Sequence, residues 1–439
     1  MKATTIKHIL FTILVLMLVL PFVQQQVNIP KIKPLKGYFL LPQKPVLNKT
    51  NLWNGSYQDS LNKYLEQHIG YRADLVRLHN QFKYTFFDTL NAAGVIQGKE
   101  GYLFELNYIK AYYGLDYVGD DTLTKHIQQT VAVNNWLKKQ KKHLIVVLAP
   151  GKGSFFPEYL PDGYAPKTKQ ITNETAYFQE LNKAGIPVIS GNRLFSAVKD
   201  SCRFGLFPQC GIHWSYYGMG LVFDSVLRTM NQLNGRQFID FGTKSIETTG
   251  KLRSPDRDLW EGLNIISKPH DKPMPYPEFT FDKKTPDSMP SFIVVADSYY
   301  WQWYGSGYAT RAFGKHDFWY YNKQIIPGDG SGAINKTDID LMTRVLEADF
   351  IILLQTDANM SRYSFGFIPE LYNAIQQHAD WDEDALSEIQ ATIARIRNSP
   401  SYMEMIREKA KKRNISIDEM IRIDANWVYE NKRKEAAKK

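Results

Sequence analysis

The sequence has few cysteines and none of the common metal or nucleotide motifs. Among 439 residues only Cys202 and Cys210 are cysteines, and they form neither a CxxC pair nor a Cys/His cluster with zinc spacing. The GxxxxGK[ST] pattern of a phosphate-binding loop is also absent. We therefore expect no metal and no cofactor. Two structural thiols are one reading of the cysteines, and for an exported chain we expect a local disulfide that braces the loop before His213.

The sequence also lacks a basic stripe interleaved with stacking aromatics. The net charge is +9, but the segment after Pro400 holds eleven Lys/Arg against seven Asp/Glu, which leaves five net charges for the first 400 residues. Nucleic-acid binding is therefore not expected, and the tail reads as a solvated basic segment. With 44% hydrophobic and 23% charged residues, the rest is typical of a globular protein.

A long apolar run occurs only at the N-terminus. Lys2 and Lys7 precede the apolar segment Ile9 to Val23, which indicates an export signal. The run is short for a span of about 20 residues, but no small-x-small cleavage site follows. We expect an uncleaved anchor rather than a removed signal peptide, with the rest of the chain outside the cytoplasm by the positive-inside rule.

The chain is expected to contain four parts. A signal or anchor (1–26) precedes an extended linker (27–50), which carries four prolines and five lysines. The main domain covers 51–380, and a charged helical extension, peripheral to the sheet, covers 381–439.

Helical and strand patterns alternate through the main domain. Apolar periodicity predicts helices at 56–68, 71–90, 120–140, 174–184 and 216–233, and uninterrupted apolar runs predict strands at 143–148, 186–189, 292–296, 318–321 and 350–354, with a hairpin at 95–104. Buried strands between helices are typical of a parallel sheet covered on both faces. The expected fold class is a three-layer α/β/α sandwich with a mostly parallel sheet.

Asp297 and Ser298 directly follow the apolar strand FIVVA. Ligands of open α/β sheets bind beyond the carboxyl ends of the strands, so Ser298 is a candidate nucleophile with Tyr299 beside it. A helix N-cap or an Asx-turn is the alternative explanation of this Asp-Ser pair.

His213 lies in the segment CGIHWSYYG, just before a helix whose expected N-cap is Ser215. A neutral imidazole there is able to accept the proton of a serine hydroxyl, although a hydrogen-bonded structural histidine remains the alternative. A third segment, LAPGKGSFFPEYLP, predicts a strand followed by a turn that lines the cleft and holds Lys152 and Ser154.

These segments, in this order, resemble the alginate O-acetyltransferase family of periplasmic SGNH hydrolase-like proteins (the AlgX/AlgJ type, grouped with DHHW proteins). VIQGKEGYLF is similar to the family's GkdGwLF hairpin, VVLAPGKGSFFPEYLP to its APnK…YPeyLP turn, GIHW to DTHW, and ADSY to GDSF. A segment beginning NLWNGSYQDS is similar to the family's N-terminal segment. The similarity runs from about residue 53 to 380.

The resemblance implies an SGNH fold with Ser298 as the nucleophile and His213 as the general base. Asp297 would order the turn. It also implies transfer of acetyl groups to a polysaccharide hydroxyl, with a membrane-bound O-acyltransferase as acyl source. A glycan acetyl-esterase and a non-catalytic glycan-binding or scaffold protein are the alternatives. The membrane would be contacted through the N-terminal segment.

One departure from the family concerns the triad acid. The family's aspartate lies two residues before the histidine, where this chain has Gly211. Asp258 and Asp357 are candidate replacements, and a Ser298–His213 dyad is the hypothesis if neither acts. Asn359, after the strand 350–354, is a candidate oxyanion donor, with loop capping as its alternative role.

Overall fold

The computed structural model describes residues 3–37, 41–166, 168–269, 271–284, 289–377 and 383–436. The expected boundary at residue 380 lies outside these ranges, as does Lys2. The chain forms two units. The first is made of Met1–Phe104, Gln209–Ile212 and Arg253–Lys272, and the second of Glu105–Pro208, His213–Leu252 and Pro273–Lys439.

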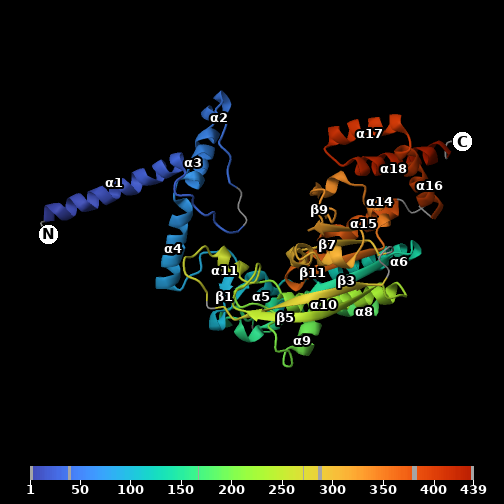
Figure 1. Cartoon of the computed structure of the whole chain (residues 1–439), viewed down its shortest axis with the longest axis horizontal. Coiled ribbons are helices and arrows are strands. Elements are labelled where there is room, and N and C mark those ends of the chain that lie inside the picture. The colour runs from blue at the N-terminus through green and yellow to red at the C-terminus, as the bar shows by residue number, and fades with distance from the viewer. Residues whose placement is uncertain are drawn as a thin grey trace. The chain divides into compact units, whose positions relative to one another are not determined.

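The apolar strands of the second unit form one sheet of seven strands in the order β10-β9-β8-β7-β11-β3-β4 (Figure 1). The strands are β3 (His143–Ala149), β4 (Val188–Ser190), β7 (Phe292–Ala296), β8 (His316–Tyr320), β9 (Gln324–Pro327), β10 (Ile334–Asn335) and β11 (Phe350–Thr356). Strands β8, β7, β11, β3 and β4 are parallel, whereas β9 and β10 add antiparallel pairs at one edge. The predicted mostly parallel sheet is therefore confirmed.

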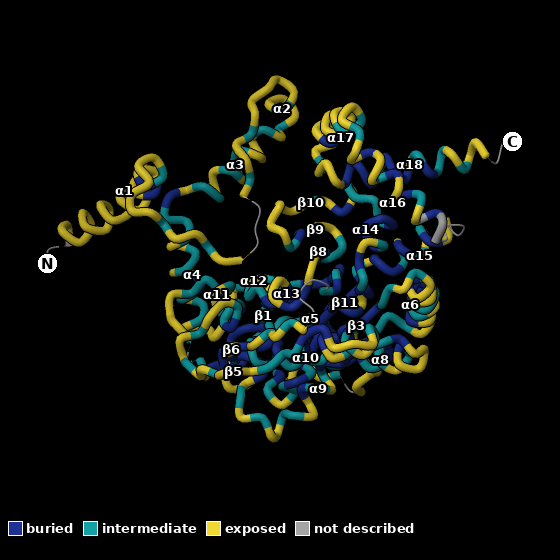
Figure 2. Tube along the Cα trace, turned by 45° about the vertical axis from the view of Figure 1, so that its right-hand side comes forward, coloured by how far each residue is buried: buried dark blue, intermediate teal, exposed yellow. Residues whose placement is uncertain are grey.

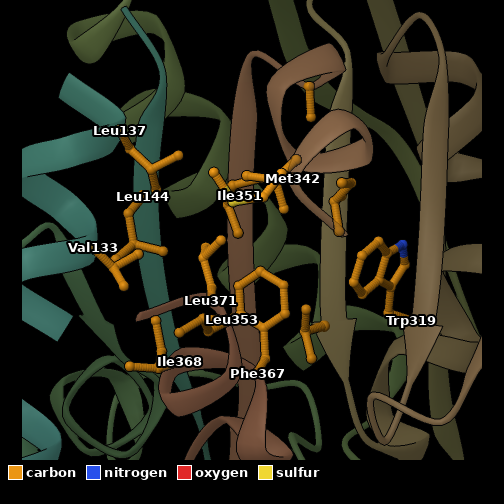
Figure 3. Packing of buried hydrophobic residues seen from close by; sticks show 14 of the residues in the cluster. Val133, Leu137, Leu144, Trp319, Met342, Ile351, Leu353, Phe367, Ile368 and Leu371 are labelled. Carbon is orange, nitrogen blue, oxygen red and sulfur yellow. The ribbon is translucent and has the colours of Figure 1, made fainter. Parts of the chain in front are cut away.

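Helices cover both faces of this sheet because successive strand residues point to opposite sides and most residues of the central strands β3, β7 and β11 are apolar. On one face, Leu144 and Ile351 pack against Val133 and Leu137 of α6 (Asp120–Lys139) and against Leu371 of α15 (Phe367–Gln377) (Figure 3). On the other face lie α9 (Gly191–Val198) and α10 (Tyr216–Leu233), which contact β3. Helix α8 (Asn173–Lys183) also lies next to the sheet, where it contacts β4.

The C-terminal helices are less peripheral than predicted. Helices α16 (Glu383–Arg397), α17 (Pro400–Arg413) and α18 (Ile417–Ala436) contribute Ile389, Ile406 and Ile421 to the same buried cluster as the sheet. Ion pairs add to this contact. Arg422 of α18 binds Glu347, which ends α14 (Leu341–Glu347), at 2.6 Å. The charge that the sequence shows in this tail is thus partly internal.

A long antiparallel ribbon, which was not predicted, packs beside α10. It consists of β5 (Ile239–Thr249) and β6 (Met274–Lys283). The ring of Phe223 in α10 meets that of Phe241 edge to face at 5.3 Å between centroids. A Cβ at Gly220 would lie 2.1 Å from the Phe279 ring, so only glycine allows this close approach.

The N-terminal apolar run lies in a helix, α1 (Ala3–Val27), that is longer than the run itself. Its segment Thr4–Val27 has 24 residues and a mean hydropathy of 2.4, so it is long and apolar enough to cross a membrane. The apolar run Ile9 to Val23 is too short to span a membrane, and the residues on both sides of it extend the helix to a sufficient length. The helix is exposed along most of its length (Figure 2).

After α1, residues 28–48 contain no helix or strand among those described, consistent with an extended linker. The first unit continues with α2 (Lys49–Trp53), α3 (Ser56–His68), α4 (Arg72–Phe87) and a hairpin of β1 (Val95–Gln97) and β2 (Leu103–Glu105), which leads into α5 (Leu106–Tyr113). A separate segment adds α11 (Asp258–Gly262). Near the end of α1, Gln24 Oε1 accepts a hydrogen bond from the Tyr71 amide at 3.2 Å, so the helix end is held by the start of α4.

The prediction of a disulfide is wrong. Cys202 and Cys210 are both cysteines in thiol form. The Cys202 thiol donates to the Phe204 carbonyl oxygen at 3.5 Å. Two cysteines close in sequence do not ensure that their Cβ atoms approach and point at each other, which a disulfide requires.

Candidate active site

Ser298 lies just after the carboxyl end of β7, which pairs with β8 on one side and β11 on the other in the parallel part of the sheet. Strand β7 is buried throughout and ends at Ala296, which pairs with Leu354 of β11 and with Tyr320 of β8. A short 3-10 turn, Ser298–Tyr300, follows at once, and Asp297 caps it. Ser298 keeps intermediate exposure, whereas its neighbours Asp297 and Tyr299 are fully buried. The partly exposed hydroxyl of Ser298 thus lies at the end of the sheet where the parallel strands terminate.

His213 lies in the loop before α10, two residues ahead of the N-cap. The prediction that Ser215 caps this helix is confirmed, because its hydroxyl accepts from the Gly218 amide at 3.0 Å. Trp214 is fully buried, and its indole stacks on Trp303 with 6.1 Å between ring centroids. Its carbonyl oxygen accepts from the Gln302 side-chain amide at 3.2 Å. The buried tryptophan therefore fixes the backbone from which His213 projects.

The structure brings these two candidate residues together although 85 positions separate them in the chain. His213 Nε2 lies 3.0 Å from Ser298 Oγ, which is hydrogen-bonding distance. If Nδ1 carries the imidazole proton, Nε2 is able to accept the serine proton. This is the arrangement that activates a serine nucleophile.

The carboxylate of Asp297 is the centre of a hydrogen-bond network and points into the protein. Its Oδ1 accepts from the Tyr299 amide at 3.1 Å. Its Oδ2 accepts from the Thr356 amide at 2.9 Å, the Thr356 hydroxyl at 2.8 Å and the Asn359 side-chain amide at 2.9 Å. Because these groups belong to the end of β11 and the turn after it, Asp297 ties the serine turn to the neighbouring strand.

Asn359 is engaged inside this network. One Nδ2 hydrogen bond goes to Asp297 and a second, at 3.0 Å, goes to Thr356 Oγ1, so both amide protons have acceptors. Its Oδ1 accepts from the Arg362 guanidinium. These contacts favour the capping role over the oxyanion role, since no amide proton remains for a substrate oxygen.

Tyr299 and Lys152 are both buried. The Tyr299 ring lies 4.9 Å from that of His213 and 5.0 Å from that of Trp214, and its hydroxyl is hydrogen-bonded to Tyr108. Tyr299 therefore packs behind the histidine. The Lys152 side chain, in the turn after β3, is 0% exposed, so it lies within the protein and not on an open cleft wall as the sequence suggested.

Of the two aspartates that could replace the triad acid, Asp357 is occupied elsewhere. Its Oδ2 accepts from the Ser154 hydroxyl at 2.6 Å and from the Asn192 side-chain amide at 3.4 Å. Asp258 Oδ1 accepts from the amide of Ile212 at 2.9 Å, and Ile212 is the residue before His213. Asp258 therefore contacts the segment that precedes His213 in the chain.

Asp357 explains the glycine-rich turn after β3. A Cβ on Gly151 would lie 2.0 Å from the carboxylate of Asp357, so this position requires glycine. The carboxyl group is completely buried, and burial raises its pKa to about 7. The hydrogen bonds from Ser154 and Asn192 act in the opposite direction and lower the pKa. The group is therefore partly protonated near neutral pH.

This raised pKa predicts a specific dependence of stability on pH. The folded chain keeps the Asp357 proton at pH values where the unfolded chain, near 3.8, has lost it. The stability contribution is thus complete below pH 3.8 and is lost as pH rises through about 7. By linkage, the loss over these three pH units is on the order of 4 kcal/mol. Asp357→Asn, which does not titrate, should gain stability relative to wild type as pH rises.

Denaturant unfolding at several pH values between 4 and 8 measures this difference. Asp121→Asn, at an exposed aspartate, is the control and should show a pH profile parallel to that of wild type. Parallel profiles for wild type and Asp357→Asn would show that this carboxyl group has an ordinary pKa.

Two residues near Ser298 were missed by the sequence reading. Thr356 gives Asp297 two of its hydrogen bonds, and the Tyr321 amide donates to the carbonyl oxygen of Ala296, two residues before Ser298, at 2.9 Å. Neither belongs to a motif, because strand pairing alone brings them to the serine turn. Within the described ranges, no three His, Cys, Asp or Glu side chains are grouped to hold a metal ion.

Comparison with known proteins agrees with the predicted family. Residues 95–287 match the family model of the SGNH hydrolase-like domain, acetyltransferase AlgX. This segment includes His213 and the turn after β3, and it ends before Ser298. No curated protein matches the chain.

Solved structures of the same kind are only distantly similar. The O-acetyltransferase domain of Pseudomonas putida AlgJ aligns over 64% of this chain and 99% of its own, with 14% identity and a TM-score of 0.41. For Pseudomonas aeruginosa AlgX the shares are 66% and 69%, with 12% identity and a TM-score of 0.39. For Bacillus cereus PatB1 they are 62% and 99%, with 10% identity and a TM-score of 0.38. Likeness this low supports no conclusion on its own.

The family match and the observed sheet bear on the same part of the chain. The match covers β3 and β4, which form one edge of the sheet. It also covers α10 and the loop before it, which contains His213. The predicted class of enzyme, an SGNH-type O-acyltransferase or esterase, is confirmed at the level of this domain family. Residues 95–287 are therefore similar to the SGNH hydrolase-like domain of the acetyltransferase AlgX.

Proposed function

We propose that the protein is an extracytoplasmic O-acetyltransferase that modifies hydroxyl groups of a cell-envelope or secreted polysaccharide through an acetyl-Ser298 intermediate. The observation that carries the proposal is the 3.0 Å distance between His213 Nε2 and Ser298 Oγ. The AlgX-type family match supports the choice of acetyl transfer.

In the first half-reaction, Ser298 Oγ attacks the carbonyl carbon of the acetyl donor while His213 Nε2 accepts the hydroxyl proton. The tetrahedral intermediate collapses, and the donor's leaving group departs with that proton from the imidazolium. The products are acetyl-Ser298, neutral His213 and the free carrier. General base catalysis of this kind contributes typically 10²–10⁴-fold to the rate.

In the second half-reaction, a sugar hydroxyl attacks the acetyl-serine carbonyl. His213 now accepts the proton of the sugar hydroxyl and returns it to Ser298 Oγ as the ester bond to the serine breaks. Water in the place of the sugar would give an acetyl-esterase, so the outcome depends on which hydroxyl occupies the site. A transferase and an esterase share every step except this one.

The proposed location follows from α1. Its apolar length suits a membrane anchor, or a signal sequence if it is removed, and Lys7 at the start supports a location of the remaining chain outside the cytoplasm. An acetyl donor made inside the cell must then cross the membrane. A membrane-bound O-acyltransferase is the partner that would deliver it, as the family resemblance implies.

His213 needs a partner that holds its tautomer. Loss of the acid in a Ser-His-Asp triad lowers the rate by about 10⁴-fold. Because Gly211 stands where the family has its acid, we propose that Ser298 and His213 work as a dyad with modest turnover.

Transfer to sugar tests the proposal directly. The full-length chain in detergent is incubated with p-nitrophenyl acetate and acetyl-free oligosaccharides of envelope glycans, and products are analysed by mass spectrometry. We expect acetylated oligosaccharide from wild type and none from Ser298→Ala. Release of acetate without sugar acetylation would identify an esterase, and no p-nitrophenol release would favour a non-catalytic glycan-binding protein.

A further inference from the structure

Helix α4 of the first unit leaves one apolar face uncovered. Four of its apolar side chains recur every three or four residues, which places them on the same side of the helix. They are Leu75, Leu78, Phe82 and Phe86, each more than half exposed, and together they are called the α4 stripe. The Phe82 ring lies 4.9 Å from that of Phe86 and 5.8 Å from that of Phe87, which ends the helix. A continuous apolar surface of this kind marks an interaction site.

The opposite face of α4 is polar and is bound to the rest of the first unit. Asn80 Nδ2 donates to the Leu263 carbonyl oxygen at 2.8 Å, and Gln81 Oε1 accepts from the Ile266 amide at 2.9 Å. The Arg77 guanidinium donates to a carbonyl oxygen of the linker at 2.7 Å. A surface helix of a soluble protein ordinarily turns its apolar side to the protein and its polar side to water. Helix α4 does the reverse, so its stripe requires an apolar environment outside the unit.

The start of α4 is held against the outer end of α1. The three glutamines at 24–26 close the apolar run, so in a membrane they would lie at the level of the lipid headgroups. Gln24 Oε1 accepts from the amide of Tyr71, the residue before α4, at 3.2 Å. A Cβ on Gly70 would lie 2.0 Å from the Pro21 carbonyl oxygen, so glycine allows this close approach. The α4 stripe therefore begins beside the bilayer that α1 would enter.

The segment between α1 and α2 has the charge that suits an anionic surface. Residues 27–50 contain five lysines and no aspartate or glutamate, although one of the lysines, Lys36, pairs with Glu261 at 3.5 Å. Basic residues next to a membrane are attracted to its anionic lipids. Trp53, which ends α2, is 94% exposed, and tryptophan is enriched at membrane–water interfaces. An anionic bilayer thus matches both the apolar and the basic parts of this unit.

We propose that α4 is a second membrane contact, an interfacial helix whose apolar stripe inserts into the outer surface of the bilayer that α1 spans. The inference rests on the extracytoplasmic, membrane-anchored location proposed above. Amphipathic helices that lie in the interface bury their apolar face about 5–10 Å into the boundary between headgroups and acyl chains. One spanning contact and one interfacial contact then hold the first unit against the membrane.

Labelling by a photoactivatable lipid tests this contact. The full-length chain is reconstituted into vesicles of phosphatidylglycerol and phosphatidylcholine that contain a phospholipid with a diazirine in its acyl chain. After illumination and digestion, mass spectrometry locates the labelled peptides. We expect label on α1 and on the peptide that carries the α4 stripe. Because no other protein is present, label on α4 identifies lipid as the occupant of the stripe.

A double variant and an internal control accompany this measurement. Phe82→Gln combined with Phe86→Gln removes the centre of the stripe and should lower the label on α4 several-fold. The melting temperature should stay at the wild-type value, because both side chains are exposed. Trp427 of α18 is 64% exposed, which is similar to Phe86 at 69%, but it belongs to the second unit and should carry little label.

The outcomes separate this inference from the proposed location. Label on α1 without label on α4 would overturn the inference and leave the membrane anchor intact, whereas no label on either helix would contradict both. If α4 instead forms cross-links with α4 of another copy, the stripe is a dimer interface. If it takes neither lipid nor a second copy, its occupant is a different membrane protein, and the inference is again wrong. Equal label on Trp427 and α4 would mean that exposure alone explains the result.

Discussion

Ser298→Ala is expected to abolish esterase and transferase activity, with a loss of roughly 10⁴-fold or more in kcat. Alanine has no atom that could accept the acetyl group, so the covalent route ends. The protein should stay folded, because Ser298 is only partly buried and the hydrogen bonds of the turn belong to Asp297. Turnover of p-nitrophenyl acetate, together with the melting temperature of the same samples, measures both effects.

His213→Ala should cause a comparable loss, since the serine then has no base at 3.0 Å. The double variant should be no slower than either single variant, because residues that act as one unit show non-additive effects. Additive losses would mean that the two side chains act in separate steps. His126→Ala, at a histidine whose ring packs on Tyr363, is a control for the removal of an imidazole away from Ser298.

Asp297→Asn is expected to lower the free energy of unfolding strongly. Oδ2 accepts three hydrogen bonds and Oδ1 accepts one. The four donors therefore require an acceptor on both oxygen atoms of the side chain, which only a carboxylate provides. An asparagine must place its NH₂ group against either the Thr356 donors or the Tyr299 amide. Breaking such a buried charged network costs about 3 kcal/mol. Denaturant unfolding should show this loss, and activity should fall because the serine turn loses its tie to β11.

Asp340→Asn is the matched control for this variant. Asp340 also accepts from a backbone amide, that of Thr343 at 2.8 Å, but as the N-cap of α14. Asparagine caps helices about as well as aspartate, so the expected change is within about 0.5 kcal/mol. Equal effects of the two substitutions would show that the Asp297 network contributes no more than an ordinary cap.

The sheet could be predicted because its strands are uninterrupted apolar runs. FIVVA, HLIVVL and FIILL are each bounded by polar or turn residues, and all three became adjacent parallel strands. The candidate pair could be named for a related reason. Ser298 follows one of these runs, and His213 precedes a clear N-cap, so each lies where a fold of this class places functional groups.

The ribbon of β5 and β6 could not be predicted in the same way. Strand β6 contains Pro275 and Pro277, which ordinarily argue against a strand. A two-stranded ribbon tolerates them because each strand has one edge without a partner, where a missing N–H group costs little. The burial of this ribbon depends on α10, more than thirty residues away in the chain from β6, and periodicity within either segment does not reveal it.

The roles around Ser298 depend on contacts that sequence spacing does not encode. Thr356 reaches Asp297 because β11 lies beside β7, and the Tyr321 amide reaches the Ala296 carbonyl oxygen because β8 lies on the other side. The burial of Lys152 and the thiol state of the cysteines were likewise decided by packing in three dimensions. Sequence motifs therefore predict the reacting residues, whereas the order of the strands in the sheet determines which residues surround them.

Detection of the acyl-enzyme is the most direct measurement of the central claim. The full-length chain is mixed with p-nitrophenyl acetate, quenched in acid within the first turnover, digested, and analysed by mass spectrometry. The account predicts one acetyl group on the peptide that contains Ser298, and its loss when an acceptor oligosaccharide is added before the quench. Turnover with no acetyl group on Ser298, or with the acetyl group on another residue, would contradict it.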